Sequence, residues 1–431
     1  MERLESYIAA LRERCAVLPD RRTGRNGRYA IADFGLAAFS VFFMQSPSFL
    51  AHQTALAEGR GRGRSNAHTL FGMTSIPCDN HIRQMLDGAP TDHFDSVFST
   101  IVKDVDARGE LKSLRCLDGR VLIALDGSEH FCSRKLSCPL CSTRKRSDGE
   151  TEYFHSFVGA TLVAPGHKTV LPLPPEFVSP QDGAAKQDCE PMAARRWLAR
   201  VGVEYSWLKP VYLGDDLYSR QPMCEDVKAI GGSFLFVCKP TSHKTLTEYL
   251  TGVELDNLTE TKGRGSEKRI HRYRWMSEVP LRDGKDAMNV NWLEIEIAKP
   301  DGKVTYRSSF VTDLPVNKNT VAELASCGRA RWKIENETFN VLKTGGYNLE
   351  HNFGHGKETL SSLLVVLNLL AFAMHNACDL LEDLWQKARE RLKARARLFE
   401  HIRSITAYHL FLSWHSLIRT IVSGVPPPLP S

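Results

Sequence analysis

The sequence predicts an α/β protein whose sheet is interrupted by a β-rich insertion and flanked by helical N- and C-terminal regions. Three observations support this fold class. Apolar residues recur with helical spacing in residues 1–115, and short apolar runs typical of strands follow in residues 116–239. Residues 240–318 then alternate apolar with polar residues, as half-exposed antiparallel strands do. A chain of 431 residues also exceeds the size of a single core, so several domains are expected.

Two glycine-interrupted arginine runs mark the N-terminal region. One covers residues 20–28, and the other, residues 59–65, contains Arg60, Arg62 and Arg64. Arginine on a flexible backbone can follow phosphates along a groove. We therefore predict that these three arginines bind DNA and that the N-terminal region is a DNA-binding domain. The alternative for each run is a solvated loop.

Apolar runs predict the strands of the central sheet. The first run is continuous and ends at Asp126, which is typical of a strand buried on both faces. The predicted strands of this part are residues 120–126, 153–163, 168–178, 208–216 and 231–239, and the predicted helices up to this point are residues 29–44, 92–105 and 191–201.

The insertion and the C-terminal third follow. Thr320 and Glu323 stand at capping-box spacing and announce the helix that carries residues 329–343. Residues 360–378 contain no Asp, Glu, Lys or Arg and approach the length of a membrane span, but polar residues interrupt them, so we expect a buried core helix. The remaining predicted elements are strands at residues 269–276, 289–298 and 303–312, a hairpin turn at residues 299–303, a charged helix at residues 380–402 and a disordered proline-rich tail.

The domain boundaries follow from these changes of pattern. The predicted domains are residues 1–115 (helical), 116–239 and 319–382 (two parts of the core), 240–318 (insertion) and 383–431 (C-terminal helices and tail). The net charge of +6 permits a polyanionic partner without requiring one. Eleven cysteines argue against a secreted disulfide scaffold, and the charged, amphipathic start lacks the apolar stretch of a signal peptide, so we expect a reducing cytoplasm.

Three acidic residues stand out by context. Asp126 and Asp215 each end an apolar run, and adjacent strand ends are a usual place for a site. Glu335 follows on a helix, four residues after Arg331. The ordinary alternatives are a turn at Asp126, an exposed loop pair of Asp215 with Asp216, and an intrahelical ion pair between Arg331 and Glu335. If the three acids converge they need a cation, and oxygen ligands suit Mg²⁺ or Mn²⁺, two of which can promote an in-line phosphoryl displacement.

The order of these features resembles the DDE transposases of the IS4-like group. The resemblance rests on a strand ending in Asp126, a strand ending in Asp215, the β-rich insertion and the sequence RWKIE followed by LK. It covers roughly residues 116–380. It implies an RNase H-like core, Asp126, Asp215 and Glu335 as the metal-binding triad, and DNA as the substrate. Asp215 is preferred over Asp216 because an aromatic residue, Tyr218, follows three positions later.

The signature helix departs from the family pattern at two positions. Gly328 stands where the signature has Tyr, and the signature Lys falls at Lys343 instead of position 342. We expect Arg331, Lys343 and Arg329 to contact DNA, with Arg331 holding a phosphate. Trp332 and Ile334 are expected to pack the helix onto the sheet, and Trp275 and Trp292 to lie buried in the insertion, with stacking on a flipped base as the alternative for those two tryptophans.

A cysteine cluster lies between the first two core strands. Cys132, Cys138, Cys141 and His155 predict a structural zinc site, with His130 as an alternative fourth ligand, because two thiolates two residues apart can grip one tetrahedral ion. The alternative is free cysteines in a hairpin.

The sequence as a whole predicts a bacterial, nucleoid-associated insertion-sequence transposase that binds terminal inverted repeats and target DNA and acts as a homodimer, with no membrane partner. The rival interpretations are a DNA nuclease without strand transfer and an inactive, domesticated DNA-binding protein.

Overall fold

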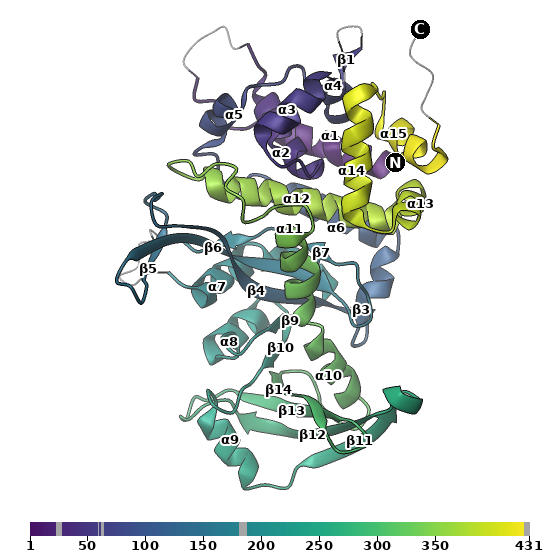
Figure 1. Cartoon of the computed structure of the whole chain (residues 1–431). Coiled ribbons are helices and arrows are strands. Elements are labelled where there is room, and N and C mark those ends of the chain that lie inside the picture. Colours follow the sequence, from purple (N-terminus) through teal and green to yellow (C-terminus); the bar gives the residue numbers. More distant parts are fainter. Residues whose placement is uncertain (23–27, 59, 62–63, 181–187, 426–431) are drawn as a thin grey trace.

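The computed structural model describes the chain except for residues 23–27, 59, 62–63, 181–187 and 426–431, and the predicted proline-rich tail lies largely outside the described residues. It is a mixed α/β protein, which confirms the predicted class. A mixed sheet of 12 strands forms its centre, with a large helical layer on one side (Figure 1).

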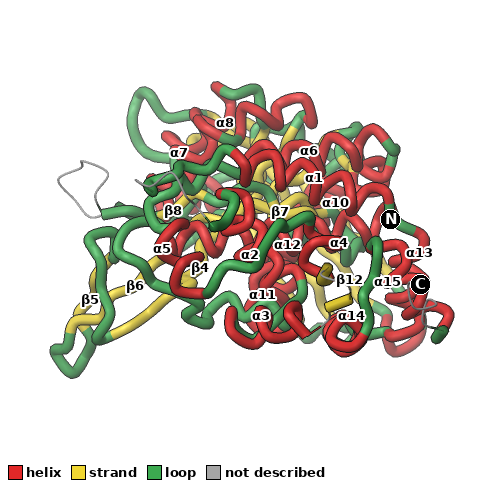
Figure 2. Tube along the Cα trace, turned by 90° about the horizontal axis from the view of Figure 1, so that it is seen from above, coloured by secondary structure: helices red, strands yellow, loops and turns green. Residues whose placement is uncertain are grey.

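The strand that carries Asp126 lies near the middle of the sheet. β4 (Arg120–Ser133) pairs antiparallel with β6 (Thr151–Val163) and parallel with β9 (Pro210–Gly214), and β9 pairs parallel with β10 (Ser233–Val237). Every residue of β9 is buried, as expected of a parallel strand covered on both faces. The hairpin formed by β5 and β6 extends away from the body of the protein (Figure 2).

The insertion continues this same sheet. β14 (Val304–Thr312) pairs antiparallel with β10, and three further strands follow outward from it. The insertion is therefore joined to the core by backbone hydrogen bonds as well as by its connecting segments. Trp275 and Trp292 are both 6% exposed, which confirms that they are buried.

The longest apolar helix, α12 (Leu360–Leu381), lies between the sheet and the helical layer (Figure 1). It is long and apolar enough to cross a membrane, but 89% of its most apolar window is buried inside the protein, as in the core helix of a soluble protein. The predicted core helix is thus confirmed. N-terminal and C-terminal helices pack together around it, and the N-terminal amine forms an ion pair with Glu382.

The helical layer and the remaining strands complete the fold. The helices are α1 (Glu2–Ala16), α2 (Ile31–Phe43), α3 (Phe49–Glu58), α4 (Asn66–Phe71), α5 (Asp79–Leu86), α6 (Asp95–Ala107), α7 (Glu190–Arg200), α8 (Gln221–Ala229), α9 (Lys244–Thr251), α10 (Val321–Arg329), α11 (Asn340–Thr344), α13 (Asp383–Leu392), α14 (Arg395–Tyr408) and α15 (Trp414–Ser423). Short 3₁₀ turns occur at η1 (Glu110–Leu114), η2 (Gly202–Leu208) and η3 (Gly265–Glu267), and η4 (Ile334–Phe339) is a π-helix. The other strands are β1 (Arg60–Gly61), β2 (Arg64–Ser65), β3 (Arg115–Cys116), β5 (Ser142–Lys145), β7 (Leu171–Pro172), β8 (Glu176–Phe177), β11 (Asp256–Lys262), β12 (Arg269–Pro280) and β13 (Asn289–Ala298).

The structure divides two of the predicted elements. The strand predicted at residues 168–178 is reduced to β7 and β8, because its prolines cannot donate to a strand ladder. The charged helix predicted at residues 380–402 breaks at Lys393, whose φ of 58° is incompatible with a continuous helix, and α13 and α14 lie on either side.

The predicted capping box at the start of α10 does not form. The Thr320 hydroxyl donates to the Pro315 carbonyl at 3.0 Å. The Glu323 carboxylate accepts the Leu117 backbone N–H at 2.7 Å. The Glu323 carboxylate therefore makes a tertiary hydrogen bond instead of the capping bond at the start of α10 that the local sequence pattern predicted.

Candidate active site

The two aspartates lie on neighbouring parallel strands: Asp215 directly follows the end of β9, whereas Asp126 lies within β4, which continues to Ser133 instead of ending at the acid as predicted. In the parallel pairing of β4 with β9, Ala124 lies opposite Leu213. Two residues further along each chain stand Asp126 and Asp215, so the register places them side by side. The predicted adjacency of these two acids follows directly from the parallel pairing.

Glu335 lies on a separate helix, and Arg331 connects it to Asp126. The Arg331 Nη1 atom lies 2.8 Å from the Glu335 Oε1 atom and 3.6 Å from the Asp126 Oδ2 atom. Arg331 is only 7% exposed. The expected phosphate contact of Arg331 stays a prediction, because in this structure its guanidinium faces the two acids.

The electrostatics of Asp126 reflect this grouping. Burial raises the pKa of Asp126 to about 7, the positive charge of Arg331 opposes the rise, and the negative charges of Glu190, Glu335 and Asp215 add to it. Four carboxylates therefore lie within one another's electric field. Such mutual repulsion is the condition under which a bound cation is most stabilising.

Glu190 is the fourth acid, and sequence reasoning missed it. It is the first residue of α7, and its Oε1 atom accepts the Tyr218 hydroxyl at 2.8 Å. Burial raises the pKa of Glu190, the Tyr218 hydrogen bond opposes the rise, and Asp215 adds to it. A side chain at Gly127 would displace the Glu190 carboxylate, which packs against this glycine. The only sequence signal for Glu190 was an acidic residue directly before Pro191, and this pattern equally fits an ordinary helix N-terminus.

The carboxylates gather loosely. Among the residues that the structure describes, only a Cys/His group brings three or more candidate ligand atoms within 4.8 Å of one another. The separation has a physical reason, because like charges repel and the Arg331 guanidinium stands between Asp126 and Glu335.

Asp216 has a different role from Asp215. The Lys239 backbone N–H donates to the Asp216 Oδ1 atom at 2.6 Å, and the Ser242 hydroxyl donates to its Oδ2 atom. Asp216 thus fixes the segment after β10, whereas Asp215 lines an open groove.

This groove, of about 630 Å³, runs between the acids and the insertion. Its lining includes Asp215, Arg331 and Trp332 on the core side, and Lys239, Tyr306 and Arg307 from β10, β14 and their surroundings. A second hollow adjoins it through Tyr306 and Trp332 and adds Arg329 and Lys333. The site therefore opens onto a surface with aromatic and cationic side chains.

The signature helix is irregular around Glu335. Trp332 is 50% exposed, so the prediction that it packs on the sheet is wrong, whereas Ile334 is fully buried as predicted. Glu335 belongs to the π-helix, and a π-turn takes up one more residue than an α-turn. The chain therefore turns less between Glu335 and Lys343 than a regular α-helix of the same length would. Gly328 packs against Phe310, and any side chain there would collide with that ring.

The residues predicted to bind DNA have mixed positions. The Arg329 guanidinium lies 4.7 Å from the centre of the Tyr306 ring, beside the groove. Lys343 lies on α11, and its ammonium forms an ion pair with Glu350 at 2.9 Å. Arg62, and the side chains of Arg60 and Arg64, lie outside the described residues.

The predicted cysteine site changes by one ligand. Cys138, Cys141 and His155 gather with His355, which the sequence analysis did not select. Cys132 lies outside this group because strand residues alternate between faces: Cys132 is opposite Phe154, whereas Phe131 is opposite His155. The Cys132 thiol is exposed and lies 3.9 Å from the Arg144 guanidinium.

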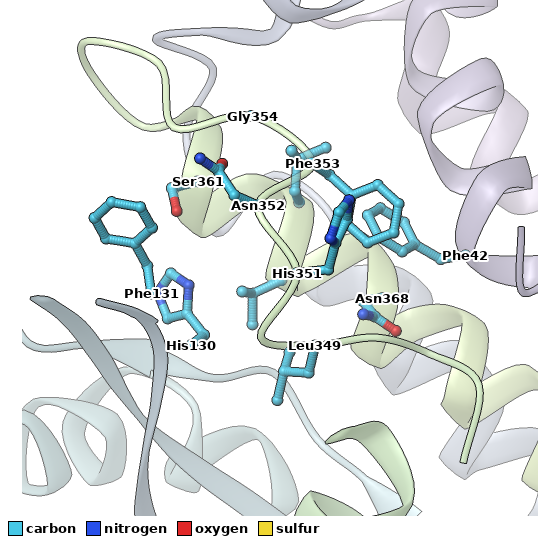
Figure 3. Close-up of a pocket in the computed structure, with 12 residues that line it drawn as sticks. Phe42, His130, Phe131, Leu349, His351, Asn352, Phe353, Gly354, Ser361 and Asn368 are labelled. Atoms are coloured by element: carbon cyan, nitrogen blue, oxygen red, sulfur yellow. The ribbon is translucent and has the colours of Figure 1, made fainter. Parts of the chain in front are cut away.

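His130, the alternative fourth ligand, also stays outside the group. Its ring stacks on that of His155 with centroids 5.7 Å apart. Figure 3 shows His130 and Phe131 from β4 around a small pocket with Leu349 and Asn352 from the loop that carries His355.

The free energy of unfolding should depend on pH through the ionisation of Asp126. Its pKa is about 7 in the folded state against 3.8 as the ordinary value, so the folded protein binds more protons between these pH values. Stability therefore falls as pH rises through this window. In magnesium-free buffer at pH 8, Asp126→Asn is expected to be about 1–3 kcal/mol more stable than wild type, below the limit set by about 1.4 kcal/mol per pKa unit. Urea denaturation measures this difference, which should vanish near pH 4; a less stable variant at pH 8 would show that ionised Asp126 supports the fold.

Comparison of the chain with models of known protein families and with curated proteins finds no match.

Proposed function

We propose that this protein is a DNA transposase that cuts and joins DNA by metal-dependent phosphoryl transfer at Asp126, Asp215 and Glu335. The observation that carries the proposal is the convergence of these acids. Asp126 within β4 and Asp215 just after β9 lie at matching positions of two paired parallel strands, and Arg331 links Glu335 to Asp126. Unrelated surface acids have no reason to approach one another from three separate elements at a partly buried position.

The topology supports an RNase H-like core. An acid-bearing central strand, β4, has an antiparallel partner on one side and two successive parallel strands on the other, with α7 and α8 in the connections. The β11–β14 segment then enters the chain before the helix of Glu335. This order of elements agrees with the resemblance to IS4-like DDE transposases.

Asp126, Asp215 and Glu335 would hold two Mg²⁺ or Mn²⁺ ions, which in such chemistry supply stabilisation of the attacking and departing oxygens of a phosphodiester. Carboxylate oxygens suit these hard cations. The burial of Asp126 and its repulsion by the neighbouring carboxylates favour the binding of a divalent cation. The remaining contribution of the chain is to bind and orient DNA in the adjoining groove. Lys239, Arg329 and Lys333 would face phosphates there.

The proposed reaction sequence uses two DNA ends. The N-terminal helices and the insertion would bind terminal inverted repeats, and cleavage would release a 3′-hydroxyl that then attacks target DNA. Bringing both ends into one complex makes the joining step an oriented reaction, and it implies a homodimer in the bacterial cytoplasm.

A strand-transfer assay tests this proposal. Duplexes carrying the terminal inverted repeats from the DNA that flanks the gene are incubated with the full chain, Mg²⁺ and a target plasmid. Joined products are expected. Cleavage without joining would overturn strand transfer in favour of a nuclease, and a gel shift without any cleavage would overturn the enzyme in favour of a DNA-binding protein.

Trp332 should contribute to DNA binding from its exposed position in the groove. Base stacking on an aromatic ring is worth about 1–3 kcal/mol, so Trp332→Ala is expected to weaken binding by about 5- to 150-fold. Fluorescence anisotropy with a labelled terminal duplex measures the change. Trp207→Ala is the matched control, because Trp207 is 40% exposed but precedes β9, at the sheet edge away from Asp215. Equal effects of the two variants would contradict a specific role for Trp332.

A further inference from the structure

A Cys/His group lies outside the acidic site, at the base of the β5–β6 hairpin. The Sγ atoms of Cys138 and Cys141 are 3.7 Å apart. The Nε2 atom of His155 lies 3.4 Å from the first and 3.3 Å from the second, and the Nε2 atom of His355 lies 3.6 Å from the Cys141 sulfur. All four ligand atoms lie within 4.8 Å of one another.

These separations match the edges of a tetrahedron around zinc. Bonds of about 2.3 Å to sulfur and about 2.0–2.1 Å to nitrogen place two sulfurs about 3.8 Å apart and a sulfur about 3.5 Å from a nitrogen. A disulfide requires a sulfur separation of only about 2.0 Å, so the Cys138 and Cys141 thiols are spaced as ligands of a common ion.

The chain prepares this arrangement locally. The Cys141 N–H donates to the Cys138 carbonyl at 3.1 Å, which closes a tight turn between the two thiols. The Cys138 N–H donates to the Cys141 sulfur at 3.3 Å, which favours a thiolate. His155 is fixed in β6 by its pairing with Phe131 of β4. Two thiolates and two neutral imidazoles are an ordinary ligand set for zinc.

His355 joins this group from a distant segment. It belongs to the loop of residues 345–359, between α11 and α12, and its ring stacks on Phe131 with centroids 4.3 Å apart and planes 23° apart. The same loop follows the helix that carries Glu335. A shared metal ion would therefore tie the segment after that helix to β6, the strand that pairs with the Asp126 strand, and to the turn before β5.

We propose that Cys138, Cys141, His155 and His355 bind one Zn²⁺ ion in a closed, tetrahedral, structural site. Four protein ligands leave no position for a substrate, which separates this site from a catalytic zinc centre. The ion holds the 345–359 loop against the β4–β6 hairpin. The proposal rests on this geometry alone and does not depend on the acidic site or on transposition.

Metal analysis of the purified full chain tests the ligand set. Protein purified without chelator is expected to contain one zinc ion per chain by mass spectrometry of the metal. Cys138→Ser, Cys141→Ser and His355→Ala should each lose most of it. Cys132→Ser is the matched control and should retain it. A wild-type protein without zinc, or equal losses in Cys132→Ser and Cys138→Ser, would overturn the proposal.

Cobalt substitution keeps the test independent of variant folding. The wild-type protein is stripped by chelation, checked by circular dichroism and reloaded with Co²⁺. The expected spectrum has intense tetrahedral d–d bands and thiolate-to-cobalt charge transfer, which one equivalent of Zn²⁺ abolishes. Weak, octahedral-type bands would overturn the site. Hydrogen exchange in residues 345–359 should rise on stripping and return on reloading, and unchanged exchange would overturn the role of His355 in holding the loop.

Discussion

Glu335→Gln is expected to lower DNA cleavage at least about a thousandfold while DNA affinity stays within about twofold of wild type. The substitution keeps the shape of the side chain but removes the negative charge that would hold the cation. Loss of a single group that stabilises developing charge already costs about 10²–10³ in rate, and loss of a metal ligand removes more. Arg331 keeps Asp126 as an acidic partner when the Glu335 charge is removed, so folding should be preserved.

Glu337→Gln is the matched control for this experiment. Glu337 lies on the same π-helix, about half a turn from Glu335, and carries the same chemistry. Cleavage of an end-labelled terminal duplex in Mg²⁺ measures activity, and anisotropy without metal measures binding. Activity should survive in Glu337→Gln. If Glu335→Gln lost binding together with cleavage, Glu335 would be a structural acid and the proposed triad would fail.

The strand aspartates could be located from sequence because their signal is local. A continuous apolar run ending in an acid predicts a buried strand with an acid at its end; β9 has this form, whereas β4 continues beyond Asp126 to Ser133. Parallel pairing then brings the acids together without any further information. The buried interpretation of residues 360–378 succeeded for a similar reason, because polar residues interrupt the apolar run that became α12.

The residues that the sequence analysis missed are those placed by tertiary contacts. Glu190 faces the acids because α7 begins beside Gly127, and His355 reaches the cysteines from a loop whose own sequence gives no ligand spacing. Trp332 was assigned to the wrong environment because regular helical spacing does not apply there. α10 ends at Arg329 and the π-helix begins at Ile334, so the angular position of Trp332 is set by the irregular turn between them.

Glu190→Gln is expected to slow cleavage by about 10- to 100-fold, the usual effect of removing a group that supports a metal site from behind its ligands. The Gly127 N–H donates to the Asp126 Oδ1 atom at 3.1 Å and also hydrogen-bonds the Glu190 carboxylate. Glu190 thereby positions the backbone that carries Asp126, and its charge adds to the field that a divalent cation would neutralise. The loss should appear in kcat and in a higher Mg²⁺ concentration for half-maximal activity, whereas the KM for DNA stays constant.

Tyr218→Phe separates the position of the Glu190 carboxylate from its charge. It removes the hydroxyl that donates to Glu190 but leaves the carboxylate, so it should cause a smaller loss of kcat with little change in the Mg²⁺ requirement. Glu248→Gln, on the exposed face of α9, serves as the matched control. Glu190 is half-buried beside the aspartates, whereas Glu248 is exposed. Equal Mg²⁺ dependence in Glu190→Gln and wild type would show that Glu190 acts on the fold of α7 and contributes nothing to cation binding.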